Sequence, residues 1–316
     1  MNTENYGRAM KRFVLDKNYR IRLLAYLGFY NSMPDEKFLK MLYKANTGEE
    51  LDLENPVKLN EKLQWLKLHD RRPEYTIMAD KYRAKEYIAS KVGEEYVVPL
   101  LGVWERAEDI DFDALPDSFV LKCNHTSSTG LCVCRDKSQL DREAVRKKLT
   151  EALAQNYYLV WREWPYKDIP RKIIAEEFLA EPDGSPLVDY KFYCYGGEPR
   201  YFMVSYGEAE HNVKNHKFDT GLNSIDHLFK AQPSIPAEDI RLPENINEMI
   251  DLAGVLCRGH QHIRVDMYNV GGKIYCGELT FFSGGGFIKM ISQDYSRYLA
   301  GLIDLKACLE GNAGEN

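Results

Sequence analysis

The sequence has no cysteine arrangement that would assign a structural class. Its seven cysteines are scattered, with no CxxC pair and no Cys/His spacing of a zinc site. Such an odd, scattered set is typical of reduced thiols and indicates a cytosolic setting. No run approaches the about 18 apolar residues of a membrane-spanning helix, and the polar opening Asn2–Asn5 predicts no signal peptide. We therefore expect a cytoplasmic protein.

The chain also lacks an excess of positive charge. It has 42 Lys and Arg against 48 Asp and Glu, a formal net charge of -6. A sequence-independent grip on nucleic-acid phosphates is therefore not expected, so the expected partners include no nucleic acid. Internal repeats and low-complexity tracts are absent too. The 316 residues, 44% hydrophobic and 28% charged, suit a soluble chain with one large domain or two lobes.

Helices and antiparallel hairpins are interspersed without a regular βαβ rhythm. Asn60 and Asp80 are the predicted N-caps of two helices, and Gly93 is the predicted C-cap of the second. Helices are expected mainly within 8–70 and at 141–157, 246–258 and 294–309, strands at 118–124, 130–135, 172–179, 189–196 and 199–206, and loops over 207–245. The pattern predicts an α+β fold in two lobes with the break near residue 175.

The stretch RIRLLAYLGFYNSM, residues 20–33, is basic at one end and apolar after it. One interpretation is a helix packed on the body of the protein. The other is a peripheral foot on a membrane, at the inner face, in contact with membrane-bound machinery. The sequence leaves both open.

Lys122 stands inside an otherwise apolar strand and precedes the loop HTSSTG. A buried lysine is costly unless it meets an anion. The loop residues Ser127, Ser128, Thr129 and Gly130 are small, so their backbone N–H groups can approach a phosphate closely. Lysine and loop together indicate a phosphate grip, although the GxxxxGK[ST] spacing is absent. The alternative is a lysine on the solvent face of an edge strand beside an ordinary turn.

Acidic residues end the apolar strand IIAEEFL. Glu176 and Glu177 could bond an adenine amino group and ribose hydroxyls, and Asp189 could join them. The alternative is a strand end that enters solvent.

The stretch IRVDMYNVGGKIYCGELTFFSGGGF reads as a hairpin followed by a glycine run. A four-residue NVGG loop would close Tyr268 on Lys273 and put Asp266 and Glu278 on opposite faces. A three-residue loop with a bulge would close Tyr268 on Gly272 instead. That register puts five side chains on one face: Arg264, Asp266, Cys276, Glu278 and Thr280.

The one-face arrangement would make a site for Mg²⁺, which takes few carboxylates and completes its shell with phosphate and water. Arg264 could stabilise charge on a reacting carbonyl or phosphoryl group, and the SGGG run could supply backbone donors. The alternative is a solvated hairpin face.

The ordered series of lysine with small-residue loop, acids on a strand end and Asp…Glu on a hairpin resembles the ATP-grasp superfamily over roughly residues 76–290. The segments LNEKLQWLKLHDRRPEYTIMADKY, FVLKCNH, YYLVWREWPYKDIPRKIIAEEFL, DYKFYCYGGEPRY and RVDMYNVGGKIYCGELTFFSGGGF resemble its TupA-like branch more closely. The resemblance implies two α+β lobes that clamp ATP. The expected domains are a helical N-terminal segment 1–75, a small lobe 76–175, a large lobe 176–308 and a disordered tail 309–316.

The resemblance also implies residue roles. Arg264 and Lys122 are the implied catalytic residues; Lys81, Lys122, His125, Ser127, Ser128, Thr129, Gly130, Glu176, Glu177, Leu179, Asp189 and Lys217 hold the nucleotide; Asp266, Glu278 and Thr280 hold the metal. Lys217 is nominated as the third phosphate-binding cation, with Lys214 and His216 left open. The superfamily often has Glu-x-Asn where this chain has Glu278-Leu279-Thr280, which puts coordination of a second ion in doubt.

The segment WREWPY, residues 161–166, is specific to the TupA-like branch. Its aromatic side chains could stack on a sugar ring, with Arg162 facing a uronate carboxylate. Alternatively, the segment is a packed connector between lobes. His125 is either a base or phosphate donor, or it orients the loop through a hydrogen bond; His260 and His262 are expected to be structural.

The resemblance implies an enzyme of bacterial surface-polysaccharide assembly, since the branch's namesake is tied to a polymer of uronic acid and glutamate. We expect an ATP- and Mg²⁺-dependent carboxylate–amine ligase that forms an acyl phosphate. Its partners would be a small-molecule or polysaccharide carboxylate and an amine. The alternatives are a sugar or polysaccharide kinase, a glycosyltransferase-associated enzyme of the same pathway, and an inactive nucleotide-binding scaffold.

Overall fold

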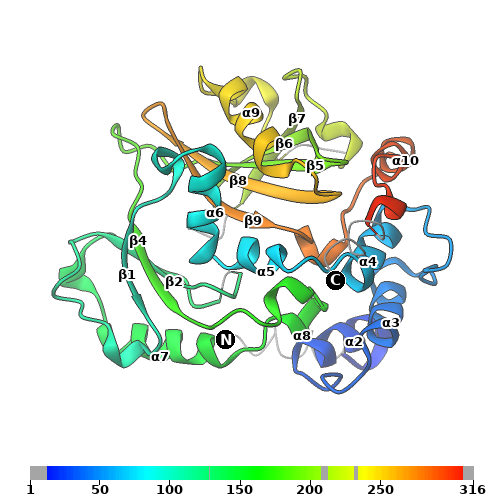
Figure 1. Cartoon of the computed structure of the whole chain (residues 1–316), viewed down its shortest axis with the longest axis horizontal. Helices are drawn as coiled ribbons and strands as arrows, with labels where there is room; N and C mark the ends of the chain where they lie inside the picture. Colours follow the sequence, from blue (N-terminus) through cyan, green and yellow to red (C-terminus); the bar gives the residue numbers. More distant parts are fainter. Residues whose placement is uncertain (1–12, 128, 208–212, 231–233, 309–316) are drawn as a thin grey trace.

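The computed structural model describes residues 13–127, 129–207, 213–230 and 234–308, and the expected tail 309–316 lies outside them. Two antiparallel sheets with helices around them make up the fold (Figure 1), so the expected α+β class is confirmed. The smaller sheet has the order β1-β4-β2-β3, with β1 Leu100–Trp104, β2 Phe119–Cys123, β3 Cys132–Cys134 and β4 Ile173–Glu177. The larger has the order β7-β6-β5-β8-β9, with β5 Asp189–Tyr195, β6 Glu198–Tyr206, β7 Lys214–Asp219, β8 His262–Val270 and β9 Lys273–Thr280.

Two strands were not expected. β1 pairs with β4 at the edge of the smaller sheet. β7 lies inside the segment 207–245, whose interpretation as loop-rich is therefore wrong for residues 214–219. Its sequence KNHKFD is mostly polar because it forms an edge strand, so it lacks the apolar alternation that marks a half-buried strand. The expected lobe boundary after residue 175 falls inside β4.

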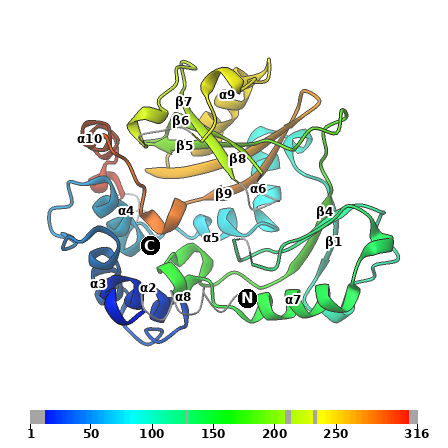
Figure 2. The ribbon, with the colours of Figure 1, turned by 180° about the vertical axis from the view of Figure 1, so that it is seen from behind.

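The helices surround and separate the sheets. They are α2 Lys17–Tyr26, α3 Asp35–Thr47, α4 Leu59–His69, α5 Glu74–Ala79, α6 Arg83–Val92, α7 Arg142–Ala154, α8 Tyr158–Trp161, α9 Ile246–Cys257 and α10 Gln293–Gly301. α7 packs on the smaller sheet through Val145, Leu149 and Ala152, while α9 covers one face of the larger sheet (Figures 1 and 2). α5 and α6 contact β9 of the larger sheet, and Lys85 of α6 forms an ion pair with Glu176 of β4 in the smaller sheet.

The predicted caps are partly right. Gly93 ends α6 as expected. The side chain of Asp80 accepts from the backbone N–H of Tyr82 at 2.9 Å, although Tyr82 itself is the N-cap residue. Asn60 is not an N-cap, because α4 begins one residue earlier and its side chain instead bonds the backbone of Ile288 in both directions.

The stretch 20–33 contributes α2, which packs on α3. Arg22 donates to the carbonyl of Ala45 at 2.6 Å, as expected of a helix packed on the body. Five apolar side chains around α2 stay exposed: Val14, Leu15, Tyr26, Leu27 and Phe29. No helix in the described ranges is long and apolar enough to cross a membrane.

The hairpin β8–β9 closes on a two-residue turn, Gly271-Gly272, with both glycines at positive φ. Both loop lengths considered from the sequence are therefore wrong. A regular hairpin from this turn would put Asp266 opposite Gly277. The register instead shifts between Asp266 and Met267, so Asp266 faces Glu278 directly. A bulge at Gly277 therefore brings the two acids to one face, as expected.

The bulge has a second effect, on Cys276. This residue pairs with Met267 and so lies on the other face of the sheet from Asp266. Its expected place beside the carboxylates is wrong. Only glycine fits the bulge without adjustment, because a Cβ at residue 277 would lie 2.9 Å from the ring of Tyr268.

Candidate active site

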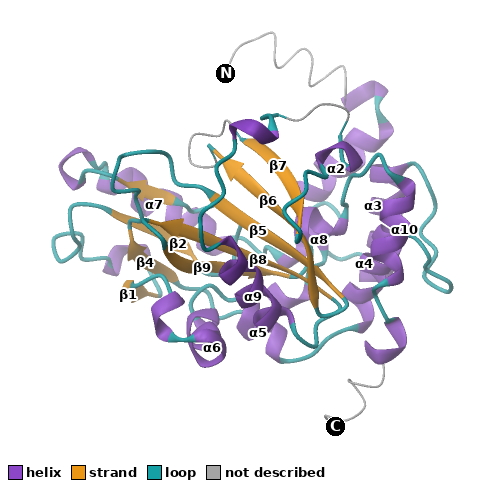
Figure 3. Cartoon of the chain, turned by 90° about the horizontal axis from the view of Figure 1, so that it is seen from above, coloured by secondary structure: helices purple, strands orange, loops and turns teal. Residues whose placement is uncertain are grey.

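The larger sheet has one mainly polar face, which Met203 and the buried rings of Tyr193 and Tyr201 interrupt. Cross-strand pairing aligns Lys217, Met203, Lys191, Asp266 and Glu278 in one row, and Asp219, Tyr201, Tyr193, Arg264 and Thr280 in the next row on the same face. Figure 3 shows the five strands side by side. The opposite face presents buried apolar residues toward α9, including Phe192, Phe202 and Val265. The alternation of each strand therefore separates a core face from a charged one.

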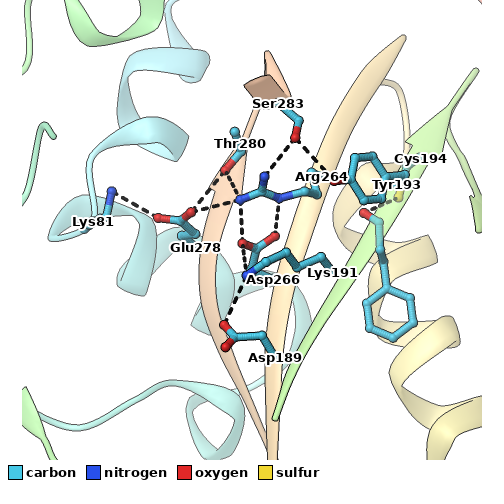
Figure 4. Close-up of polar contacts among 11 residues, drawn as sticks. Lys81, Asp189, Lys191, Tyr193, Cys194, Arg264, Asp266, Glu278, Thr280 and Ser283 are labelled. Carbon is cyan, nitrogen blue, oxygen red and sulfur yellow. Dashed lines mark hydrogen bonds and ion pairs between the residues drawn. The ribbon is translucent and has the colours of Figure 1, made fainter. Parts of the chain in front are cut away.

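Arg264 organises the centre of the polar face (Figure 4). Its guanidinium forms two bonds to the Asp266 carboxylate, at 2.5 and 2.6 Å, and one to Glu278 at 3.1 Å. It also donates to Ser283 at 2.9 Å and to Thr280 at 3.3 Å. This fork holds the two carboxylates side by side and leaves the arginine at the start of the glycine run.

Lys81 joins this face to the smaller sheet's loop. Its Nζ lies 3.1 Å from a Glu278 carboxylate oxygen and donates to the carbonyl of Thr126 at 2.8 Å. Burial alone would raise the pKa of Glu278, but Lys81 and then Arg264 outweigh it and hold that pKa well below its ordinary value. Lys122 contributes in the same direction. Lys81, which precedes α6, and Glu278, on β9, therefore lie at one centre.

The donor set suits Mg²⁺ completed by a nucleotide. Asp266 and Glu278 offer adjacent carboxylates, and the Thr280 hydroxyl donates to Glu278 at 3.3 Å. No three His, Cys, Asp or Glu side chains in the described ranges are grouped to hold a metal unaided. Mg²⁺ is usually bound by one or two carboxylates plus substrate phosphates, so the residues fit the ion.

Lys122 points to a carboxylate of its own sheet. Its Nζ lies 2.6 Å from one oxygen of Glu176, and Lys85 lies 2.7 Å from the other. Lys85 also donates to the carbonyl of Val98 at 2.7 Å. The Glu176 carboxylate is thus bound by two lysines. It does not extend beyond the end of β4. Two cations share one anion, which leaves a net positive charge for a phosphate.

The loop after β2 is anchored at both ends. His125 is buried, and its Nε2 lies 3.2 Å from the carbonyl of Gln155; burial lowers its pKa to about 4. This favours the loop-orienting role among the alternatives for His125. The Thr126 hydroxyl donates to the carbonyl of Thr129 at 2.6 Å. Ser127 is exposed.

Two further loop positions complete this picture. Gly130 has φ 78°, and a Cβ there would lie 2.6 Å from Ala152, so the loop returns tightly onto α7. Ser128 lies outside the described residues.

The remaining nucleotide candidates occupy different settings. Glu177 is exposed and its backbone N–H donates to Pro99 at 3.0 Å, while Leu179 is partly exposed beyond the strand end. Asp189 lies 3.2 Å from Lys191, which in turn lies 3.7 Å from Asp266. Asp189 and the metal-site carboxylates are therefore linked through one lysine.

Strand register distinguishes the three candidates for the third cation. Lys217 pairs with Met203 and lies on the polar face, where it contacts Asp226 at 3.4 Å. Lys214 and His216 point to the other face, and His216 is buried against Ser224 and the carbonyl of Ile235. Of the three, Lys217 alone shares the face of Asp266.

The segment 161–166 packs between the N-terminal helices and the site. Arg162 is 1% exposed, donates to backbone carbonyls of residues 30, 31, 33 and 159, and lies 3.2 Å from Asp35. It therefore cannot face a uronate, and that interpretation is wrong. The Trp164 Nε1–H donates to the carbonyl of Asp70 at 3.0 Å, and Trp161 packs on Phe287. The packed-connector interpretation is the one observed.

Sequence reasoning missed four charged or polar residues here: Lys85, Lys191, Ser283 and Glu163. Two had a signal. Lys191 alternates with Asp189 on β5, and Lys85 lies one helical turn after Lys81. Ser283 and Glu163 occupy irregular segments, where no periodicity indicates direction.

Comparison with known proteins supports the resemblance. A family model described as TupA-like ATPgrasp matches residues 61–304. No curated protein matches the chain. Similar solved structures include D-alanine–D-alanine ligase from Bacillus anthracis complexed with ATP, at 17% identity and TM-score 0.47 over 76% of this chain and 69% of that one. D-cycloserine synthetase DcsG gives 11% identity and TM-score 0.43 over 75% and 73%. The ATP-grasp ligase PsnB, complexed with minimal precursor, Mg and ADP, gives 10% and 0.40 over 87% and 73%.

Proposed function

Because the chain belongs to the TupA-like ATP-grasp family, we propose that it is an ATP-dependent carboxylate–amine ligase that works through an acyl phosphate. The observation that carries the proposal is the position of Lys81, which bonds both Glu278 of the larger sheet and Thr126 of the loop. Phosphate-binding groups and metal-binding carboxylates therefore meet at one side chain. An ATP phosphate chain needs both kinds of group at one place.

Each residue has a task in this reaction. Lys122, Lys85 and the loop after β2 neutralise and position phosphates, with Glu176 giving up its hold on the two lysines. Asp266 and Glu278 would hold Mg²⁺, whose charge offsets that of the transferring phosphoryl group. Arg264 stabilises the oxyanion that develops when the amine attacks the acyl carbon. No protein nucleophile is required.

For the substrates, we propose a carboxylate on a uronic-acid-containing surface polysaccharide or its precursor, and an amine such as an amino acid. The support is the sequence resemblance to the TupA-like branch. We place the reaction on the cytoplasmic side, where ATP is supplied. Contact with membrane-bound assembly machinery would involve the exposed apolar side chains around α2, including Leu15 and Phe29.

The test is ADP and phosphate release from ATP and Mg²⁺ with pooled uronic acids and amino acids. Release that requires both a carboxylate and an amine, with an amide product by mass spectrometry, is expected. ATP turnover indifferent to every carboxylate would contradict ligation. A phosphorylated product formed without an amine would identify a kinase instead.

A further inference from the structure

Glu163 is a buried acid whose carboxylate has no partner among the residues that the structure describes. It lies between α8 and the short helix Trp164–Tyr166, and it is 3% exposed. Within the described ranges, no hydrogen bond or ion pair reaches its carboxylate, although its backbone carbonyl accepts from the N–H of Tyr166. Buried charges are ordinarily paired, because an unpaired one loses its hydration without compensation.

The cations around Glu163 are occupied elsewhere. Lys67 donates to the side chain of Gln64 at 2.9 Å and to the carbonyls of Trp161 and Gly285 at 2.9 and 2.7 Å, which uses all three of its donors. Lys81 is bound to Glu278 and Thr126. Arg264 is committed to Asp266, Glu278, Thr280 and Ser283. Glu163 therefore feels their charge without a bond to any of them.

Glu163 lies beside the proposed reacting centre, because Lys67 joins the carbonyl of Trp161, two residues earlier, to Gly285 in the turn that begins with Arg264's partner Ser283. The charges that act on it come from Lys67 on α4, Arg264 on β8 and Lys81 before α6. Burial raises the pKa of Tyr157 and Tyr166; the charges of Glu163 and Glu278 raise it further, and Arg264 lowers it.

The segment that carries Glu163 is held against the glycine run. Lys67 bridges the carbonyls of Trp161 and Gly285, and a Cβ on Gly285 would lie 2.6 Å from the Trp161 ring. Glu163, two residues after Trp161, is thus held next to the turn Ser283–Gly286, which carries Arg264's partner Ser283.

The two carboxyls of this site, Glu163 and Glu278, have opposite electrostatic settings. Burial raises the pKa of Glu163 to about 7, with Lys67, Arg264 and Lys81 only partly offsetting it. Glu278 is held ionised by its ion pairs. Two neighbouring carboxyls whose pKa values differ in this way are typical of a site in which one group transfers a proton and the other stays ionised.

We propose that Glu163 receives the ammonium group of the amine acceptor and removes its first proton. The inference rests on the proposed ligase function. The carboxylate accepts a proton from R–NH₃⁺ and becomes a carboxylic acid, and the neutral R–NH₂ attacks the acyl phosphate carbon. The C–N bond forms while the C–O bond to phosphate breaks, phosphate leaves with the electron pair, and the second amine proton goes to solvent. The acceptor is therefore a primary amine that is cationic at neutral pH, and not a hydroxyl.

The first test needs no knowledge of the natural substrates. Methylammonium is the probe, and infrared difference spectra follow protonation of Glu163 in the ADP- and Mg²⁺-loaded protein, with Glu163→Gln identifying the band. Methylammonium should lower the pH at which Glu163 ionises, because a bound cation favours the charged carboxylate. Tetramethylammonium, which has no N–H donor, should leave the pH at which Glu163 ionises unchanged when it is added at equal ionic strength. An equal response to both cations, or none, overturns the inference.

The second test separates acyl transfer from acyl-phosphate formation. Hydroxylamine, which is largely unprotonated at neutral pH, serves as an acceptor that needs no general base. Glu163→Gln should lower kcat/KM for the cationic amine by about 10²-fold or more, while carboxylate-dependent ADP release with hydroxylamine stays near the wild-type rate. The defect with the amine should shrink as pH rises and free amine accumulates.

Glu61→Gln is the matched control, since Glu61 is similarly buried at 4% but accepts from the backbone N–H groups of Val57 and Lys58. It should leave the preference between acceptors unchanged. Equal loss with both acceptors in Glu163→Gln would show a structural role and overturn the inference. If no carboxylate supports ADP release by the wild type, the ligase proposal fails by itself, and the methylammonium titration still decides whether Glu163 binds a cation.

Discussion

Each sheet contributes a cluster of charged side chains to the site, and the two clusters differ in net charge. The smaller sheet's cluster has two cations, Lys85 and Lys122, around one acid, Glu176. The larger sheet's cluster pairs three acids with three cations: Asp189, Asp266 and Glu278 with Lys191, Arg264 and Lys81. The smaller sheet's cluster has a surplus of positive charge that would suit a phosphate. The larger sheet's cluster has carboxylates, paired with Arg264 in this structure, that would suit a metal ion.

The comparison leads us to propose that substrate binding here exchanges one set of ion-pair partners for another. Burying isolated charges would cost several kcal/mol per ion, so the unliganded protein pairs them with one another. On the proposed function, a phosphate would replace Glu176 beside the lysines, and Asp266 would hold a metal ion in place of Arg264. Arg264, once released, would then be available to the reacting carbonyl.

The largest effect is expected on the carboxylate side. Asp266→Asn and Glu278→Gln each remove a metal-binding charge, and each should lower ATP turnover by about 10³-fold or more. ADP release measures the loss, and circular dichroism checks the fold. Glu248→Gln, at an exposed carboxylate that accepts from Tyr96, is the control and should keep full activity. Near-normal turnover in both site variants would refute the metal assignment.

A somewhat smaller effect is expected on the lysine side. Lys122→Met and Lys85→Met should each reduce kcat/KM for ATP by about 10²-fold, because each removes one charge from a phosphate. Initial rates at varied ATP separate binding from turnover. If Lys85→Met has no effect, the smaller sheet offers a single cation and the proposed surplus does not exist.

Glu176→Gln tests the exchange itself. It should lower the free energy of unfolding by about 3–5 kcal/mol, because two buried lysines lose their partner. Urea denaturation measures the loss. ADP with Mg²⁺ should then stabilise the variant more than it stabilises the wild type, since phosphate supplies the missing anion. An equal ligand-induced shift in Tm for both proteins would contradict the exchange.

The smallest effect is a difference in pH dependence between two acids. Glu278 has a folded-state pKa below the ordinary value of about 4.3, so its stabilising contribution is present above that pH and is lost as pH falls further. Glu163 has a raised pKa, so its cost appears as pH rises from about 4.3 toward 7. In Tm profiles, Glu278→Gln should flatten the acid limb, and Glu163→Gln should raise Tm near neutrality. Parallel profiles would contradict both assignments.

The fold and part of the site could be predicted from the sequence. Alternation places Arg264 and Asp266 on one face whatever the turn, and the apolar strand around Lys122 is evident from its composition. The position of Glu278 could not be predicted, because it depends on a bulge at Gly277 that hairpin rules do not locate. Glu176 was expected at the adenine, but its contacts with Lys85 and Lys122 come from separate elements and leave no mark on one segment.

Arg162 has a practical consequence for anyone who shortens this protein. The family match begins at residue 61, so α2 and α3 could be taken for segments that a shortened protein can lack. Yet Arg162 donates to the carbonyls of residues 30, 31 and 33 and pairs with Asp35, and all of these residues lie before residue 61. A fragment that begins at the family boundary would leave the buried Arg162 guanidinium without these partners, one residue before Glu163. A minimal expression product should therefore start upstream of Tyr30.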